Sequence, residues 1–198
     1  MIKTSPKRLS GSGWTAGFCL DLHTKGSTFV GHNEFGHPEF STTRTEIGDL
    51  IYRAKYGNDE SALEPIATAL ADFLTSWKPG IDVIVPVPPS NPRRKLQVVS
   101  QLAERLGKLT GIKVCLDCVR KVKLTSELKN VYDYKKRTEL LEEAFAIDPE
   151  KVRGKRILLF DDLYRSGATA ERISQLLRTE GSAQDVFLLT VTRTRSKI

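Results

Sequence analysis

The residues that decide the fold are Ile157-Leu158-Leu159-Phe160-Asp161-Asp162-Leu163-Tyr164-Arg165-Ser166-Gly167-Ala168-Thr169. Four apolar residues in a row indicate a buried strand, and the Ser-Gly-Ala-Thr run is typical of a loop that opens a helix. A strand that leads through a polar loop into a helix is typical of α/β proteins, whose ligand sites lie at the carboxyl edge of the sheet. We therefore expect a ligand site directly after Phe160.

The polar loop of this segment matches a sugar monophosphate at both ends. Two adjacent carboxylates, Asp161 and Asp162, can accept hydrogen bonds from the two vicinal hydroxyls of a ribose 2,3-diol. The helix N-terminus offers backbone N–H groups to a phosphate, Gly167 lets the backbone approach it, and Ser166 and Thr169 add hydroxyl donors. The residues expected to bind the ribose and its 5-phosphate are Asp161, Asp162, Leu163, Tyr164, Arg165, Ser166, Gly167, Ala168 and Thr169.

Two other interpretations of the segment carry less weight. The Walker B strand of an ATPase is also an apolar run that ends in acids, but it requires a G-x-x-x-x-G-K-[ST] loop, and this sequence has none. A strand whose acids merely cap the next helix is the simpler alternative. It leaves the Ser-Gly-Ala-Thr run at this offset unexplained.

A second segment reads as a strand that runs into a proline-rich basic loop, Val83-Ile84-Val85-Pro86-Val87-Pro88-Pro89-Ser90-Asn91-Pro92-Arg93-Arg94. Prolines pre-set the backbone angle φ, and arginines bind phosphate oxygens in bidentate fashion, so the loop suits a pyrophosphate group. The alternative is a solvated basic turn. The candidate pyrophosphate-binding residues are Pro88, Pro89, Ser90, Arg93 and Arg94.

From Ile81 onward, short apolar runs alternate with helical patterns, which favours βαβ units and a mainly parallel sheet. The expected strands are 81–87, 112–115, 156–160 and 186–191, and the expected helices lie near 98–109, 135–143 and 168–178. Upstream, 45–56 and 61–77 show apolar residues at helical spacing, and 14–31 reads as a β-hairpin. We expect residues 1 to 45 to form a β-rich, hood-like addition and residues 46 to 198 to form the core.

Composition and charge limit the class of protein. The chain has 198 residues, with 39% hydrophobic and 28% charged, which suits one main globular domain. No apolar run approaches the roughly 20 residues needed to cross a bilayer, so we expect no membrane association and a cytoplasmic protein. The net charge of +7 indicates an anionic partner, either a polyphosphate ligand or nucleic acid. Basic residues are dispersed rather than interleaved with aromatics, so nucleic acid stays open but is not favoured.

The cysteines do not indicate a metal site. Three cysteines make no disulfide framework, which favours a reducing compartment. Cys115 and Cys118 form a single C-x-x-C pair, without the second Cys or His pair that a structural zinc site uses. We therefore expect no bound metal at this pair, which should lie in or beside a strand.

The segment from Asp161 to Thr169 resembles the signature of type I phosphoribosyltransferases for 5-phosphoribosyl-1-pyrophosphate (PRPP): four apolar residues, two acids, and a short loop that ends in Thr/Ser-Gly-x-Thr. Within that superfamily the chain resembles the ComF-like group, named for a protein of natural competence. The stretches that carry this resemblance are Val85-Pro86-Val87-Pro88 with arginines after it, Lys55-Tyr56-Gly57, and Arg137 placed eight residues before Phe145.

The resemblance implies a type I phosphoribosyltransferase fold, an α/β domain with a mainly parallel central sheet flanked by helices. It implies that a nitrogen nucleophile displaces pyrophosphate from C1 of PRPP, which brings Mg²⁺ as cofactor. The acceptor is not identified, and a homodimer is left open. Asp161 and Asp162 would be the catalytic residues, residues 88–94 would hold the pyrophosphate, and Lys135, Lys136 and Arg137 are candidates for a lid.

Two alternative functions stay open. The first is a non-catalytic regulator or DNA-uptake accessory protein that binds the ligand or single-stranded DNA. It is favoured by Arg94-Lys95-Leu96-Gln97-Val98, which stands where the ComF-like group usually has Arg-Gly-aromatic-Asn-Gln. The second is a metal- or nucleic-acid-binding module that uses the cysteine pair and the basic C-terminal tail.

Overall fold

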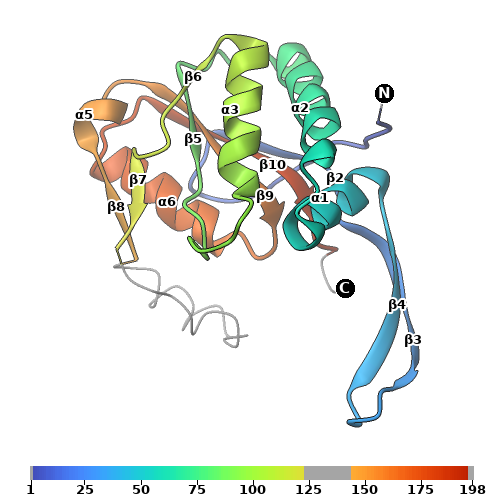
Figure 1. Ribbon diagram of the computed structural model, residues 1–198. Helices are drawn as coiled ribbons and strands as arrows, with labels where there is room; N and C mark the ends of the chain where they lie inside the picture. Colours follow the sequence, from blue (N-terminus) through green and yellow to red (C-terminus); the bar gives the residue numbers. More distant parts are fainter. Residues whose placement is uncertain (1, 123–143, 196–198) are drawn as a thin grey trace.

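The structure is a computed structural model that describes residues 2–122 and 144–195. Its centre is a six-stranded sheet in the order β1-β2-β10-β9-β5-β6 (Figure 1). The strands are β1 (Lys7–Arg8), β2 (Ala16–Leu22), β10 (Asp185–Arg193), β9 (Arg156–Tyr164), β5 (Val83–Pro86) and β6 (Lys113–Val114). The edge pair β1 and β2 is antiparallel, and the other neighbouring strands run parallel. This confirms the predicted α/β class with a mainly parallel sheet.

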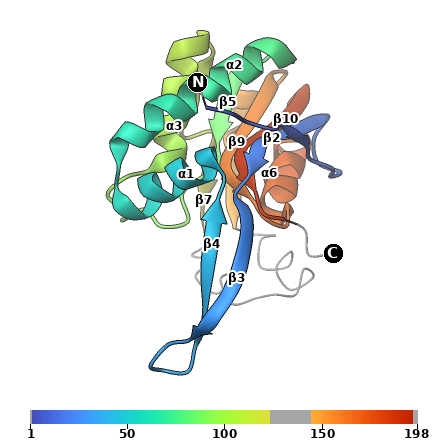
Figure 2. The same ribbon diagram turned by 90° about the vertical axis from the view of Figure 1, so that its right-hand side faces the viewer.

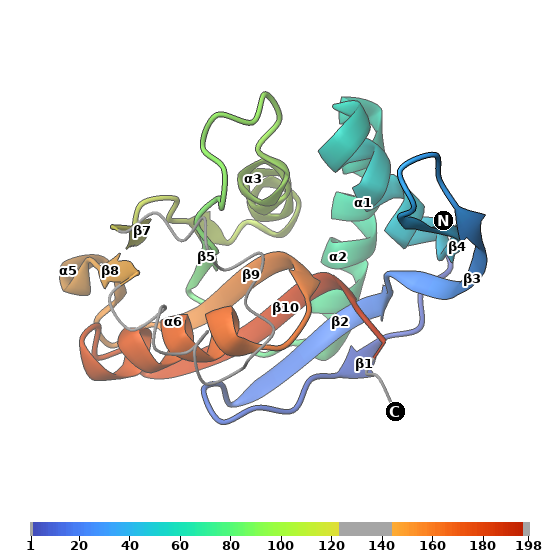
Figure 3. The ribbon, with the colours of Figure 1, turned by 90° about the horizontal axis from the view of Figure 1, so that it is seen from below.

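Helices cover both faces of this sheet, as Figure 3 shows from below. One face carries α1 (Glu46–Gly57), α2 (Leu63–Trp77) and α3 (Val98–Thr110), and the other carries α6 (Ala168–Thr179). The apolar run of β9 supplies both layers, since Leu158 and Phe160 pack with the first group of helices while Ile157 and Leu159 pack with α6. A strand buried on both faces must be apolar throughout, which explains the uninterrupted run.

The helix ends follow local sequence signals. Helix α1 begins after Thr45, whose side-chain oxygen accepts a hydrogen bond from the Gly48 backbone N–H, and it ends at Asn58 in the left-handed conformation. A short 3-10 turn, η1 (Glu60–Ala62), connects α1 to α2. Helix α3 ends at Gly111, where φ is 74° and glycine is favoured. These caps set the residues at which α1 and α3 end.

The predicted hairpin of residues 14–31 is wrong. Strand β2 lies inside the central sheet, parallel to β10, and its Cys19 and Leu20 are fully buried. The chain turns at His23 and continues as β3 (Thr24–His32), which pairs instead with β4 (Pro38–Arg44) in a separate two-stranded ribbon that projects from the body (Figure 2). The alternation of apolar residues in β2 reflects burial against helices, which a pattern of period two cannot distinguish from a half-exposed hairpin.

Several element boundaries also differ from expectation. Strand β9 continues through Asp161 and Asp162 to Tyr164, because the neighbouring strand β10 pairs with it as far as Arg193. A small ribbon of β7 (Val119–Lys121) and β8 (Phe145–Ile147), followed by the short helix α5 (Pro149–Val152), was not expected. The predicted helix 135–143 lies outside the described residues. Among the described residues, no helix is long and apolar enough to span a membrane.

The burial of β9 predicts a large cost for truncating Phe160, whose side chain is 0% exposed. We expect Phe160→Ala to lower the free energy of unfolding by about 3–5 kcal/mol, since it removes buried apolar contacts and leaves a cavity. Phe35→Ala is the control, because Phe35 is 75% exposed in the loop between β3 and β4, and it should change stability by less than about 0.5 kcal/mol. Urea unfolding measures both, and similar losses would contradict this assignment of the core.

Candidate ligand-binding cleft

A cleft of about 370 Å³ lies at the carboxyl ends of β5 and β9. These two strands are parallel neighbours with Pro86 opposite Phe160, and the Val87 N–H donates to the Phe160 carbonyl oxygen at 2.8 Å. Beyond this point β5 leaves the sheet as a loop, while β9 continues beside β10 as far as Tyr164, so the loop after β5 lies next to the end of β9. The two loops that the sequence indicated meet in one site, as expected for the carboxyl edge of a parallel sheet.

The structure brings most of the predicted residues to this cleft. Asp161, Asp162 and Leu163 at the end of β9 line the cleft, together with Arg165 of the following loop and Thr169 of α6. From the loop after β5, the lining residues are Pro88, Pro89, Ser90 and Arg94. Arg93, Ser166, Gly167, Ala168 and Tyr164 do not line it. Arg93 and Ser166 are exposed to solvent. The candidate lid residues Lys135, Lys136 and Arg137 lie outside the described residues. The roles of all these residues stay predictions.

The two acids differ in their surroundings. Asp162 is 5% exposed and its Oδ2 pairs with the Lys55 Nζ of α1 at 2.6 Å. Asp161 is partly buried, and its Oδ1 accepts a hydrogen bond from the Asp162 backbone N–H at 2.8 Å. Burial and the neighbouring Asp162 charge raise the pKa of Asp161 to about 7, while Lys55 opposes the shift. Asp162 thus forms an ion pair with a lysine, whereas the pKa of its neighbour Asp161 lies near neutrality.

The segment between β9 and α6 leads through Gly167 into the N-terminus of α6. Gly167 precedes α6 with φ of 84°, and no side chain caps the first turn of this helix. A Cβ at Gly167 would collide with the phenol ring of Tyr164. That ring packs edge-on against Trp14, with 6.2 Å between centroids, and its hydroxyl donates to the Ser10 carbonyl oxygen at 3.2 Å. Tyr164 therefore packs between the loop at Gly167 and the N-terminal segment that contains Ser10 and Trp14.

The loop after β5 is held by Gln97, which stands just before α3. Its side-chain amide donates to the carbonyl oxygens of Asn91, Pro92 and Arg94 at 3.2, 3.1 and 2.8 Å. Asn91 adds a local turn, because its Oδ1 accepts from the Arg93 backbone N–H at 3.0 Å. A loop rich in prolines that is tied by one amide keeps its shape without a ligand.

Asn91, within the predicted pyrophosphate loop 88–94, also lines the cleft. The other lining residues lie outside the segments that the sequence assigned to the ribose, the 5-phosphate or the pyrophosphate: Lys55 and Tyr56 of α1, Val87, Leu96 to Ser100 around the start of α3, Lys121 of β7 and Phe145 of β8. The Lys55-Tyr56-Gly57 stretch supported the family resemblance, but no local pattern places the end of α1 beside β9. That placement comes from the packing of α1 on the sheet.

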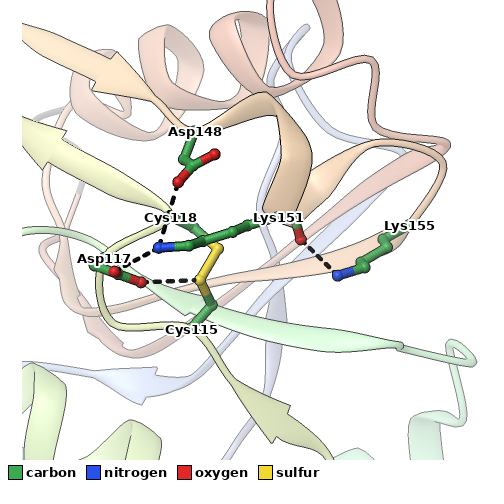
Figure 4. The surroundings of a disulfide bond; sticks show 6 residues. All are labelled: Cys115, Asp117, Cys118, Asp148, Lys151 and Lys155. Atoms are coloured by element: carbon green, nitrogen blue, oxygen red, sulfur yellow. Dashed lines mark hydrogen bonds and ion pairs between the residues drawn. A yellow bond between two sulfur atoms is a disulfide. The ribbon is translucent and has the colours of Figure 1, made fainter.

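The C-x-x-C pair is a disulfide in the structure, a bond that the sequence did not indicate. Cys115 and Cys118 follow β6 and precede β7, beside strands as expected, and Cys115 lies 3.5 Å from the Asp117 Oδ1 (Figure 4). Lys151 pairs with Asp117 at 2.5 Å and with Asp148 at 3.3 Å. Among the described residues, no group of three or more His, Cys, Asp or Glu side chains is placed to hold a metal ion.

The raised pKa of Asp161 predicts how stability depends on pH. Its pKa is about 7 in the folded protein against an ordinary value of 3.8, so the folded state binds more protons between these limits and stability falls as pH rises through them. Asp161→Asn removes this ionisation. When the pH is raised from about 5 to about 8.5, the free energy of unfolding of the variant should therefore fall less than that of the wild type. Urea unfolding at both pH values tests this. Equal changes in the two proteins would contradict the raised pKa.

Comparison with known proteins finds similarity to solved structures alone. No protein-family model matches the sequence, and no curated protein matches it. An adenine phosphoribosyltransferase is 14% identical over 85% of this chain and 93% of that chain, with a TM-score of 0.48. The Saccharomyces cerevisiae enzyme of that name is 14% identical over 83% of both chains, with a TM-score of 0.47. Glutamine PRPP amidotransferase from B. subtilis is 22% identical over 65% of this chain, with a TM-score of 0.46, and this chain spans 26% of its length.

Proposed function

We propose that this chain is a phosphoribosyltransferase of type I fold, which transfers 5-phosphoribose from PRPP to a nitrogen acceptor and releases pyrophosphate. The observation that carries the proposal is the single cleft that joins a pair of acids, the segment leading to a helix N-terminus, and a basic proline-rich loop. These three parts match the diol, the 5-phosphate and the pyrophosphate of one ligand. A solvated turn or a simple helix cap would not need all three at one edge of the sheet.

In this proposal each part of the cleft has one task. Asp161 and Asp162 accept hydrogen bonds from the ribose diol, and the segment from Arg165 to Thr169 binds the 5-phosphate with backbone N–H and hydroxyl donors. The loop from Pro88 to Arg94 binds the pyrophosphate. Mg²⁺ enters bound to the oxygens of PRPP, as part of the substrate, and adds positive charge beside the leaving group when bound.

The reaction breaks the bond between C1 and the pyrophosphate oxygen and forms a bond between C1 and the acceptor nitrogen, which then loses a proton. Positive charge grows on the ribose ring while negative charge grows on the departing pyrophosphate. The carboxylates of Asp161 and Asp162 lie on the ribose side, and the Arg94 guanidinium lies on the pyrophosphate side, so both charges meet groups of opposite sign.

The finer assignments belong to this proposal as well. We place the chain in the ComF-like group, with residues 46 to 198 as the transferase core and residues 1 to 45 as an addition. In that addition, β1 and β2 join the central sheet and the projecting β3–β4 ribbon is the part that would shape the acceptor pocket. Lys135, Lys136 and Arg137 would close over the pyrophosphate and exclude water, which otherwise captures the ribose cation.

A second candidate function is a non-catalytic regulator or DNA-uptake accessory protein that uses the same cleft. It is favoured by Gln97, which belongs to the altered Arg94 to Val98 stretch. The side-chain amide of Gln97 donates its hydrogen bonds to carbonyl oxygens of the preceding loop. Such a protein would bind PRPP, or single-stranded DNA, without transferring the ribose.

Removing Asp162 should weaken PRPP binding. We expect Mg²⁺–PRPP to bind the wild type and Asp162→Ala to bind it roughly tenfold to a hundredfold more weakly, because each charge-assisted hydrogen bond contributes about 1.5–3 kcal/mol. Isothermal calorimetry measures the affinity. Asp72→Ala is the matched control, an exposed acid on α2 that does not line the cleft, and it should bind PRPP as the wild type does. An unchanged PRPP affinity in Asp162→Ala would contradict the proposal that Asp162 binds the ribose diol.

Catalysis is tested by pyrophosphate release from PRPP across a panel of purine, pyrimidine and amine acceptors. We expect release above the buffer rate with at least one acceptor, and a lower rate in Asp162→Ala, because the acids stabilise the charged ribose. Titration with single-stranded DNA at several salt concentrations runs in parallel. Tight PRPP binding without release for any acceptor would leave the regulator as the function.

A further inference from the structure

The last turn of α1 contacts both halves of the cleft through two consecutive residues. Lys55 and Tyr56 both line the cleft, and the helix ends directly after them at Gly57, with Asn58 as its C-cap. Helix α1 lies on the same face of the sheet as α3 (Figure 3). The end of α1 is therefore in reach of the segment after β9 and of the loop after β5.

Lys55 contacts the half of the cleft that holds the acids. Its Nζ lies 2.6 Å from the Asp162 Oδ2, and the two side chains are 20% and 6% exposed. A buried carboxylate without a partner is costly, so the ion pair with Lys55 offsets this cost and orients the Asp162 side chain. The backbone at this point is held separately, because the Thr192 hydroxyl donates to the Asp162 carbonyl oxygen at 3.2 Å. Lys55 therefore acts on the side chain of Asp162.

Tyr56 contacts the basic half. The Arg94 Cζ lies 5.7 Å from the centroid of its ring, within the range of a cation–π contact. The ring of Tyr52, one turn earlier, packs against Tyr56 with 4.9 Å between centroids, and Arg44 in turn covers Tyr52 at 3.6 Å. Tyr56 is 66% exposed, so it is not a residue of the core. The stack presents its ring to an arginine that lines the cleft.

We propose that Lys55 and Tyr56 are positioning residues, each for one part of the ligand: Lys55 aims Asp162 at the ribose, and Tyr56 holds Arg94 at the pyrophosphate. This inference rests on the proposed function and assigns a role to a helix end that lies outside both predicted loops. If the two residues served only the stability of α1, their loss would weaken every ligand alike. Because Lys55 contacts Asp162 and Tyr56 contacts Arg94, the loss of each residue should instead weaken the binding of a different part of the ligand.

The test measures the affinities of two probes by calorimetry, ribose 5-phosphate alone and pyrophosphate with Mg²⁺. Lys55→Met should weaken ribose 5-phosphate by about tenfold or more and change pyrophosphate by less than about twofold, since it acts through one charge-assisted contact. Tyr56→Leu should do the reverse, with pyrophosphate weakened by about twofold to fivefold, as the loss of an exposed cation–π contact predicts. Lys55→Arg and Tyr56→Phe keep the charge and the ring, and should restore the affinities.

Arg53→Met is the matched control for Lys55→Met. Arg53 is a cation of the same helix that pairs with Asp59 at 2.5 Å, and it does not line the cleft. It should leave the affinities of both probes unchanged. The circular dichroism melting curve of each variant shows whether it folds.

A double-mutant cycle tests whether Lys55 acts through Asp162. Adding Lys55→Met to Asp162→Asn should cause no further loss of ribose 5-phosphate affinity. The double variant removes both charges of the ion pair, so its affinity can be compared with that of Asp162→Asn even where Lys55→Met alone does not fold. A further loss would overturn the role of Lys55. Equal weakening of both probes by either single variant, or affinities equal to those of Arg53→Met, would overturn this inference alone. A wild type that binds neither probe would overturn the proposed function and this inference together.

Discussion

The parallel pairing of β5 with β9 is the constraint on which the site depends. The ladder ends with Pro86 opposite Phe160, and the Val87 N–H donates to the Phe160 carbonyl oxygen. The loop after β5 therefore begins beside the residues of β9 that carry the two acids. Parallel strands share a carboxyl edge, and two loops that are about 70 residues apart in sequence thereby line one cleft. A shift of either strand by one residue would turn its acids or its prolines to the other face.

The two acids of the cleft are affected by different factors: an ion pair in the case of Asp162, and mainly burial in the case of Asp161. Asp161 and Asp162 are adjacent along β9 and both line the cleft, but their side chains have different neighbours. Lys55 satisfies the buried Asp162, whereas burial and the charge of Asp162 raise the pKa of Asp161. The two acids of one motif are therefore chemically distinct before any ligand arrives.

The N-terminal residues serve the site indirectly. Ser10 and Trp14 contact Tyr164 behind the segment that precedes α6, and β2 widens the sheet beside β10. The β3–β4 ribbon projects from this body with Phe29, Phe35 and Phe40 exposed. The N-terminal residues thus pack behind the candidate phosphate loop through Ser10 and Trp14, whereas the β3–β4 ribbon extends into solvent.

Local sequence patterns predicted the strand and helix around Asp161 to Thr169, the basic loop after β5, and the mainly parallel sheet. These follow from local causes, namely an apolar run buried on both faces, a glycine at positive φ before a helix, and prolines that fix the backbone. Only the folded structure shows that β2 joins the central sheet, that β9 extends to Tyr164, and that Lys55 and Tyr56 enter the cleft. Each of these depends on which surfaces meet after the chain folds, and the pairing of residues far apart in sequence leaves no periodic pattern along the chain.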